Sequence, residues 1–280
     1  IMKAITNRVI ICYFFYLWYN KSNLKEGLIT LKIATYNVKN KTANKILKGH
    51  ASLTNSFLMN FEIIKSADPD VIGLQEVTKE EYSMLRKQFE RTYNIYGEFR
   101  GSFGVTNEAC PIMIKKQDIN VLDYKTFSLS DDIMKLGNKY KGSLFPRIAT
   151  YIRFMYGKDE YSIINVHVDN VKKIQNKTFK ENGSLQQILD LSCGGSHIIV
   201  GDMNTEIKNG LKDFCLRNSL SDAALPLGNT YKPLNLALDH ILYSDSDLSV
   251  SEVKAYENAG SDHSLILANM SRRWGDLYVS

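Results

Sequence analysis

The sequence predicts an α/β protein in which β-sheets pack beneath helices, over residues 29–280. Segments with strand-like patterns outnumber helical ones, and many are apolar on both faces, as expected of buried strands. The composition is 44% hydrophobic and 23% charged, which is ordinary for a globular protein of 280 residues. No stretch after residue 28 has the composition of a linker, so a single domain is expected.

The first elements follow from two periodicities. Residues 29–38 alternate with a period of two, which predicts a strand. Residues 52–67 place Leu53, Phe57 and Phe61 at helical spacing, which predicts a helix with one buried face.

A short buried strand is predicted in residues 68–77, after a proline turn. Thr78 and Glu81 then form a T-x-x-E capping box, which predicts a helix as far as about Phe89. Later strands are predicted in residues 110–116, 147–156, 161–168, 197–203, 239–244 and 264–270, with a helix around 184–192.

Polar residues accumulate where these strands begin or end. They are Asn37, Gln75, Glu76, His167, Asp169, Asp202, Asn204, Asp239, Asp262 and His263. Burial of such a polar side chain without a hydrogen-bond partner costs roughly several kcal/mol of folding free energy. A shared aqueous cleft, with the carboxylates around a metal ion, would satisfy all of them, and this arrangement is typical of phosphate chemistry.

Eight short motifs run in order from residue 29 to about residue 270. They are TYNV, LQEV, NEACPIMIKK, FPRIATYIRF, NVHVDN, GDMN, LDHILYS and GSDH. In this order they resemble the endonuclease/exonuclease/phosphatase superfamily, which includes pancreatic deoxyribonuclease, abasic-site endonucleases, deadenylases, neutral sphingomyelinases and inositol-phosphate phosphatases. The resemblance implies a four-layer sandwich, with two mixed β-sheets packed face to face and helices on the outside.

The resemblance also implies a role for each matching residue. Glu76 would hold the catalytic cation, Mg²⁺ or Mn²⁺, with Asn37 beside it on the ion or the substrate, and Asp262 would complete the metal side. Asp202 would orient or deprotonate the attacking water. Asn204, on the same side of an extended segment, would donate a hydrogen bond to the scissile phosphate.

Five further residues are implied around the phosphate. His263 would contact it or move a proton, while Asp239 would fix the tautomer of His263 through the other ring nitrogen. Glu108 and His167 resemble a second carboxylate–imidazole pair, in which His167 is a candidate general acid. Arg147 resembles a phosphate-contacting arginine. The choice of acid and base among the two histidines and the water-orienting aspartate stays open, since interacting groups titrate as a set.

These residues predict a metal-dependent phosphodiesterase, with nucleic acid favoured as the substrate because of the His167 and Glu108 pair. Two other substrates stay open, a phospholipid of the sphingomyelin type and a small phosphoester. A catalytically inactive binding protein would have lost a metal-binding or water-activating residue, and none is lost.

Residues 1–28 form a separate N-terminal segment. Residues 9–19 are apolar and would cover about 16 Å as a helix, short of the roughly 30 Å hydrocarbon core of a bilayer. This length, behind Lys3 and Arg8, suits a signal peptide or membrane association, so a secreted or membrane-associated protein is favoured over a cytoplasmic one. Four basic residues and one acidic residue in this segment account for +3 of the net charge of +5, so no strongly basic catalytic domain is predicted.

Overall fold

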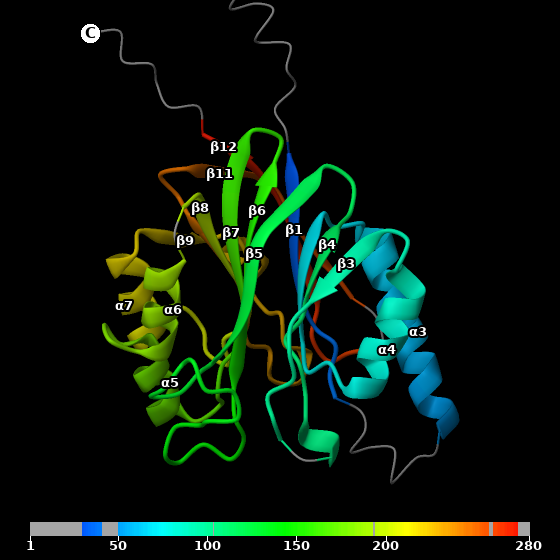
Figure 1. The fold of residues 1–280 in the computed structure, drawn as a ribbon, viewed down its shortest axis with the longest axis horizontal. Helices are drawn as coiled ribbons and strands as arrows, with labels where there is room; N and C mark the ends of the chain where they lie inside the picture. Colours follow the sequence, from blue (N-terminus) through cyan, green and yellow to red (C-terminus); the bar gives the residue numbers. More distant parts are fainter. Residues whose placement is uncertain (1–29, 41–49, 103, 193, 258–259, 274–280) are drawn as a thin grey trace, which may run out of the picture. The chain divides into compact units, whose positions relative to one another are not determined.

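The computed structural model describes residues 30–40, 50–102, 104–192, 194–257 and 260–273 (Figure 1). The chain divides into two compact units, Ile1–Thr30 and Leu31–Ser280, and the elements below all belong to the second. The predicted N-terminal segment 1–28, with its apolar residues 9–19, lies outside the described residues. Within the described part of the chain, no helix has the length and apolar character needed to cross a bilayer.

The first sheet has six strands in the order β11-β12-β1-β2-β4-β3. Only its central strands β1 and β2 run parallel, and its other neighbours are antiparallel. The bounds are β1 Leu31–Asn37, β2 Val71–Gln75, β3 Tyr93–Tyr96, β4 Ile112–Lys115, β11 Leu248–Tyr256 and β12 Leu265–Arg272.

The second sheet repeats this plan in the order β5-β6-β7-β8-β10-β9. Its central strands β7 and β8 run parallel, and the remaining pairs are antiparallel. The bounds are β5 Ile119–Ser128, β6 Ile148–Tyr156, β7 Asp159–His167, β8 Ser196–Asp202, β9 Leu220–Asp222 and β10 Asp239–Ser244.

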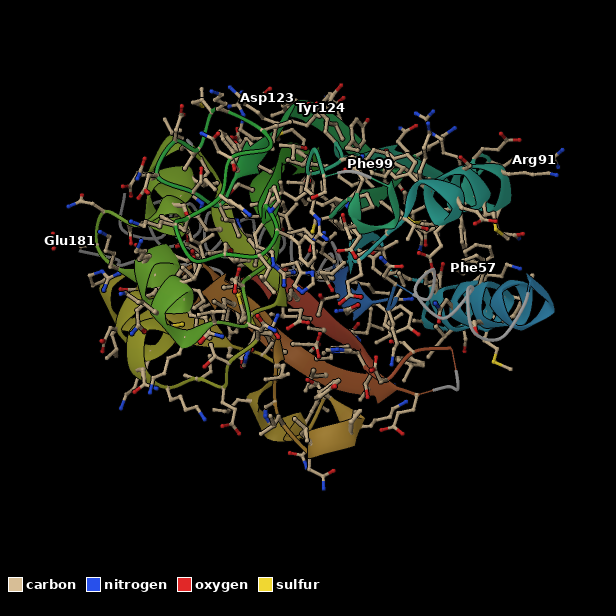
Figure 2. The ribbon with its side chains drawn as sticks, turned by 90° about the horizontal axis from the view of Figure 1, so that it is seen from below. Phe57, Arg91, Phe99, Asp123, Tyr124 and Glu181 are labelled. Atoms are coloured by element: carbon tan, nitrogen blue, oxygen red, sulfur yellow. The ribbon has the colours of Figure 1, made fainter. Side chains whose placement is uncertain are left out.

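Helices cover the outer face of each sheet. On the first sheet lie α3 (His50–Ala67) and α4 (Lys79–Phe89). On the second lie α5 (Lys172–Phe179), α6 (Ser184–Leu191) and α7 (Asn209–Arg217). Figure 2 shows Phe57 of α3 and Glu181, which follows α5, on opposite sides of the sheets. Short 3₁₀ helices are η1 (Gly104–Thr106), η2 (Leu225–Leu227) and η3 (Lys232–Leu234).

Three apolar clusters hold these layers together. One packs side chains of α3 and α4 against the first sheet, another packs α5, α6 and α7 against the second, and the third lies between the sheets. The predicted four-layer sandwich of two mixed sheets is therefore confirmed. The two described cysteines, Cys110 and Cys215, are buried free thiols.

The capping box is also confirmed. The Thr78 hydroxyl accepts a hydrogen bond from Glu81 N at 3.3 Å, and the Glu81 carboxylate accepts one from Thr78 N at 3.2 Å. Helices α5 and α7 were not predicted. Like α6, they lack a side-chain capping bond, but their segments are more polar than that of α6 and show a weaker apolar pattern. Strand β5 was missed because most of its first half is exposed and shows no regular apolar alternation.

A buried carboxamide joins the two sheets. Asn165 Nδ2, from β7, donates to the carbonyls of Leu74 at 2.8 Å and Pro111 at 2.9 Å, and its Oδ1 accepts from Gln75 Nε2 at 2.6 Å. A Cβ added to Gly73 would lie 2.7 Å from this side chain, so the close approach requires glycine. The sheets are thus held together one residue before β2 ends.

Replacement of Asn165 by alanine should therefore lower the free energy of unfolding by about 2 to 4 kcal/mol, because buried polar groups lose their partners. Urea denaturation measures this change. Asn120→Ala, at an exposed position of β5, should change the free energy by less than about 0.5 kcal/mol. An equal loss in both variants would show that the carboxamide does not couple the sheets.

Candidate active site

Polar residues from both sheets meet at one end of the sandwich. Asn37 ends β1, and Glu76 directly follows β2. In the second sheet, Asp202 at the end of β8 lies directly between His167 of β7 and Asp239 of β10, because both are its partners in the strand register. Strand pairing alone therefore places two carboxylates and an imidazole side by side.

The Asp202 carboxylate is the centre of this group and is 2% exposed. Its Oδ2 accepts a hydrogen bond from Asn37 Nδ2 at 3.0 Å, and its Oδ1 accepts one from Asn204 N at 2.9 Å. The Nε2 atoms of His167 and His263 each lie 3.8 Å from Oδ2. Asp202 therefore contacts donors from both sheets.

The same burial makes Asp202 a base near neutral pH. Burial, and then the negative charge of Asp239, raise the pKa of Asp202 to about 7, although His263 lowers it in part. A general base with a pKa near the working pH is suited to proton transfer.

His263 is held by Asp239 and is positively charged. Its Nδ1 lies 2.8 Å from Asp239 Oδ2, the position that the resemblance implied, and the Tyr231 ring packs on it at 4.8 Å between centroids. Burial lowers the pKa of His263, but the charge and hydrogen bond of Asp239 outweigh this and raise it to about 9. Thr230 Oγ1 donates to the same Asp239 oxygen at 2.7 Å.

Glu76 and Asn37 lie side by side as expected, but Asn37 turns its amide nitrogen toward the carboxylates. Asn37 Nδ2 donates to Glu76 Oε1 at 3.1 Å as well as to Asp202, while its Oδ1 accepts from Lys39 N at 2.9 Å. Asn37 therefore bridges two carboxylates, whereas a metal ligand would present its oxygen to the ion. Glu76 Oε2 accepts from Asn40 N at 2.8 Å, and the Glu76 side chain is 25% exposed.

Asp262 is neutralised by a lysine that the sequence patterns did not single out. Lys39 Nζ donates to Asp262 Oδ2 at 2.5 Å, and the two side chains are 38% and 18% exposed. A divalent cation on Asp262 would compete with this ammonium group.

His167 and Glu108 are each paired with an arginine and make no hydrogen bond or ion pair with one another. Arg147 Nη1 donates to His167 Nε2 at 2.9 Å, so the ring is neutral with its proton on Nδ1. Burial, and then Arg147 and Arg100, hold the pKa of His167 well below its usual value. Arg100 Nη1 binds Glu108 Oε2 at 2.9 Å, and Asn40 Nδ2 donates to Glu108 Oε1 at 2.7 Å. Burial raises the pKa of Glu108, with Arg100 opposing it.

Asn204 reaches the site through a turn, and not along an extended segment as predicted. Strand β8 ends at Asp202, and Asn204 has a φ of 50°, in the left-handed region that Asn tolerates better than most residues. The Asn204 side chain donates to the Val168 carbonyl at 2.9 Å, and its own carbonyl accepts from Gln175 Nε2 at 2.8 Å. Asn204 therefore belongs both to the Asp202 turn and to the start of α5.

The donor atoms of this site fit a divalent cation. Among the residues that the structure describes, ligand atoms of Asp202, Asp239 and His263 lie within 4.8 Å of one another, and Asp239 Oδ1 is buried without a hydrogen-bond partner. Because the hydrogen bond to Asp239 keeps His263 protonated, His263 would have to lose that proton to bind an ion. The partly exposed Glu76 carboxylate is an oxygen donor that needs no such change.

Five residues of the site carry no sequence signal that would have singled them out. They are Lys39, Asn40, Arg100, Thr230 and Tyr231. All lie in loops, where apolar periodicity gives no information. Arg100 is 5% exposed. A buried arginine in a loop can be recognised as a site residue only when the position of its partner, Glu108, is known from the structure.

The model of the endonuclease/exonuclease/phosphatase family matches residues 34–263. A comparison with curated protein sequences gives no match.

Solved structures of this fold cover most of the chain. A family protein from Bacteroides thetaiotaomicron is 19% identical, with 88% of this chain and 99% of that chain covered and a TM-score of 0.74. The mannosyl-6-phosphatase Bt3783 of the same species is 20% identical, with 86% and 99% covered and a TM-score of 0.70. TDP2 of D. rerio, complexed with a single-strand DNA product, is 16% identical, with 87% and 99% covered and a TM-score of 0.67. At these identities the likeness establishes the fold.

The charged state of His263 predicts a specific pH dependence of stability. Because its pKa is raised from 6.5 to about 9, its contribution to the free energy of unfolding is fully present below pH 6.5 and is lost as the pH rises toward 9. In chelator, the stability difference between the parent and His263→Gln should shrink by at most about 1.4 kcal/mol per pH unit in this window.

Thermal and urea unfolding at several pH values measure this difference. His197→Gln is the matched control, since burial lowers the pKa of His197 and its contribution should not change above pH 6.5. A constant difference between the parent and His263→Gln up to pH 9 would contradict the charged assignment.

Proposed function

Because the chain belongs to the endonuclease/exonuclease/phosphatase family, whose members hydrolyse phosphoester bonds, we propose that it is a divalent-metal-dependent phosphodiesterase that uses Asp202 as its base. One observation carries the proposal. The Asp202 carboxylate has a pKa near 7 and lies 3.8 Å from the protonated ring of His263. A base and a cation are thus adjacent, an arrangement that favours hydrolysis at phosphorus.

In the proposed reaction Asp202 takes a proton from the attacking water. The water oxygen forms a new bond to phosphorus, the ester P–O bond breaks opposite to it, and the departing alkoxide takes a proton from solvent. Asn37 orients Asp202 by donating to its Oδ2. Asp202→Asn would keep a similar shape but could not accept the proton.

Positive charge and hydrogen-bond donors would stabilise the phosphate oxygens in the transition state. His263 carries a proton and is held by Asp239, so its Nε2–H is available to a phosphate oxygen. Arg147 supplies a guanidinium next to this site, and Asn204 a carboxamide. His167 is neutral here, which favours a positioning or hydrogen-bonding role over that of general acid.

Glu76 is the residue proposed to hold the divalent cation, Mg²⁺ or Mn²⁺, together with Asp262 once Lys39 is displaced. Such a cation would withdraw negative charge from the phosphate oxygens. The amide of Asn37 would keep the Glu76 carboxylate in place next to Asp202.

Nucleic acid is the first proposed substrate, from the sequence motifs and from the fold shared with a protein solved with single-strand DNA. A small phosphoester is the second, and it is favoured by a cavity rich in carboxamides that opens beside Asn204. The phospholipid alternative, a membrane contact through residues 9–19 and a secreted or membrane-associated location stay proposals from the sequence alone.

Incubation of the full chain with supercoiled plasmid and Mg²⁺ or Mn²⁺ tests the proposal. We expect nicking that chelator abolishes and that Asp202→Asn and His263→Ala each slow by roughly 10²- to 10⁴-fold, the usual contribution of acid–base catalysis. Asp123→Asn, at an exposed position of β5 (Figure 2), should leave the rate unchanged.

Two outcomes would contradict parts of this proposal. Nicking that persists in chelator or in Asp202→Asn would contradict the mechanism. Intact plasmid with hydrolysis of bis(p-nitrophenyl) phosphate would exclude nucleic acid and keep the phosphodiesterase.

Removal of the Lys39 ammonium should strengthen metal binding, since it frees Asp262. In Lys39→Ala, the Mg²⁺ concentration for half-maximal activity should fall by about threefold to tenfold, an estimate for one partly exposed ion pair. Lys87→Ala, on the exposed face of α4, is the control. An unchanged or higher Mg²⁺ concentration for half-maximal activity would exclude Asp262 as a metal ligand.

A further inference from the structure

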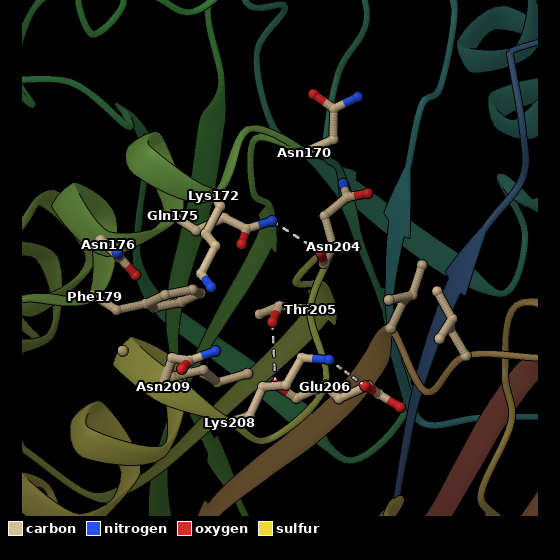
Figure 3. Close-up of a pocket in the computed structure, with 14 residues that line it drawn as sticks. Asn170, Lys172, Gln175, Asn176, Phe179, Asn204, Thr205, Glu206, Lys208 and Asn209 are labelled. Carbon is tan, nitrogen blue, oxygen red and sulfur yellow. Dashed lines mark hydrogen bonds and ion pairs between the residues drawn. The ribbon is translucent and has the colours of Figure 1, made fainter.

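A cavity of about 290 Å³ lies beside the candidate active site, between α5, α7 and the loop that follows β8 (Figure 3). Asn204 and Thr205, which follow Asp202 in sequence by two and three residues, form part of the cavity wall. Because Asn204 N donates to Asp202 Oδ1 at 2.9 Å, this wall begins two residues from the proposed base. A group in the cavity could therefore remain attached to a phosphate at Asp202. The volume is near the lower limit of ligand pockets and suits a single small ring.

Carboxamides dominate the polar lining of this cavity. They belong to Asn170, Gln175, Asn176, Asn204 and Asn209. Each carboxamide both donates and accepts hydrogen bonds, as each hydroxyl group of a sugar or polyol does. Many such groups around a small volume match a ligand with several hydroxyls.

The lining is less suited to a nucleobase. Bases are usually held by stacking on exposed aromatic rings or on arginine planes. The one aromatic residue of the lining is Phe179, which is 1% exposed, and the lining contains no arginine. Hydroxyl recognition is therefore favoured over base stacking.

Gln175 supplies an unpaired acceptor in this wall. It is 8% exposed, and its Nε2 donates to the Asn204 carbonyl at 2.8 Å, while its Oε1 accepts no hydrogen bond from any described residue. Figure 3 shows its oxygen on the side of the amide group away from Asn204. This oxygen is therefore a free acceptor in the cavity wall, and a ligand hydroxyl could donate a hydrogen bond to it.

The charges of the lining suit a phosphorylated ligand. Lys208 Nζ is neutralised by Glu206 Oε2 at 2.5 Å. Lys172, at the start of α5, makes no ion pair with the residues described, so the lining keeps one uncompensated positive charge.

We infer that this cavity holds the hydroxylated ring, from a sugar or a polyol, that the substrate carries next to its scissile phosphate. The inference rests on the proposed function, because the ring is part of the ester that is hydrolysed. Two sources share this chemistry, a free sugar or polyol phosphate and the pentose of a nucleic-acid strand.

Calorimetric titration of the full chain in chelator tests the inference without turnover. The ligands are glucose 6-phosphate, ribose 5-phosphate, thymidine 5′-phosphate, phenyl phosphate and inorganic phosphate. We expect the sugar-containing phosphates to bind at least about tenfold more tightly than phenyl phosphate, an effect of one or two added hydrogen bonds. A stronger preference for the hexose phosphate points to a small phosphoester, and one for the pentose ligands points to a strand.

Variants connect this preference to the cavity. Gln175→Leu should reduce it by about tenfold, because it removes the unpaired acceptor as well as the hydrogen bond to the Asn204 carbonyl and retains the volume. Asn176→Leu, at an exposed position of α5, should weaken the preference in the same direction with less risk to folding. Gln88→Leu, exposed on α4, is the matched control and should change nothing.

Phenyl phosphate that binds as tightly as the sugar phosphates would overturn the inference. So would a preference that survives in both Gln175→Leu and Asn176→Leu. Hydrolysis of bis(p-nitrophenyl) phosphate, which carries no hydroxylated ring, reports on the proposed function separately. If bis(p-nitrophenyl) phosphate is hydrolysed but sugar-containing phosphates bind no more tightly than phenyl phosphate, only the cavity assignment is overturned. If sugar-containing phosphates bind more tightly but no hydrolysis occurs, only the proposed function is overturned.

Discussion

The buried carboxylate of Asp202 is the constraint around which this end of the molecule is organised. The pairing of β8 with β10 places Asp202 directly opposite Asp239, so two carboxylates are buried side by side. Two buried like charges are costly unless a cation or hydrogen-bond donors compensate them. His263 supplies the cation, and Asn37 supplies a donor from the other sheet. The arrangement that compensates this burial also produces a base with a pKa near 7.

The two histidines differ because of their neighbours. His167 accepts a hydrogen bond from Arg147 and lies near Arg100, so it stays neutral. His263 donates to Asp239 and is protonated. The same type of side chain is therefore a neutral group on one side of Asp202 and a positive charge on the other. A phosphate bound near Asp202 would have the positive charge of His263 on one side and those of Arg147 and Arg100 on the other. Asp202, the base, lies between them.

Much of the fold and of the candidate site could be predicted from the sequence, because apolar periodicity marks the strands and polar residues mark their ends. Glu76 and Asp202 stand out as polar groups at the end of apolar segments, and Asp239 as one at the start of such a segment. What they contact depends on register and on loops, which periodicity does not encode. For this reason Lys39 on Asp262, the amide orientation of Asn37 and the left-handed turn at Asn204 emerged only from the structure. Helices α5 and α7, which line the carboxamide cavity, were missed because their short segments are more polar than that of the predicted helix α6.

Asp202 and His263 are proposed to act as one unit in phosphoester hydrolysis. The most direct measurement is the rate of bis(p-nitrophenyl) phosphate hydrolysis by the parent, Asp202→Asn, His263→Ala and the double variant, at saturating Mg²⁺. Residues that act as a unit are strongly non-additive. We therefore expect the double variant to be no more than about threefold slower than the slower single variant. Single variants that keep the parent rate, or losses that multiply in the double variant, would contradict it.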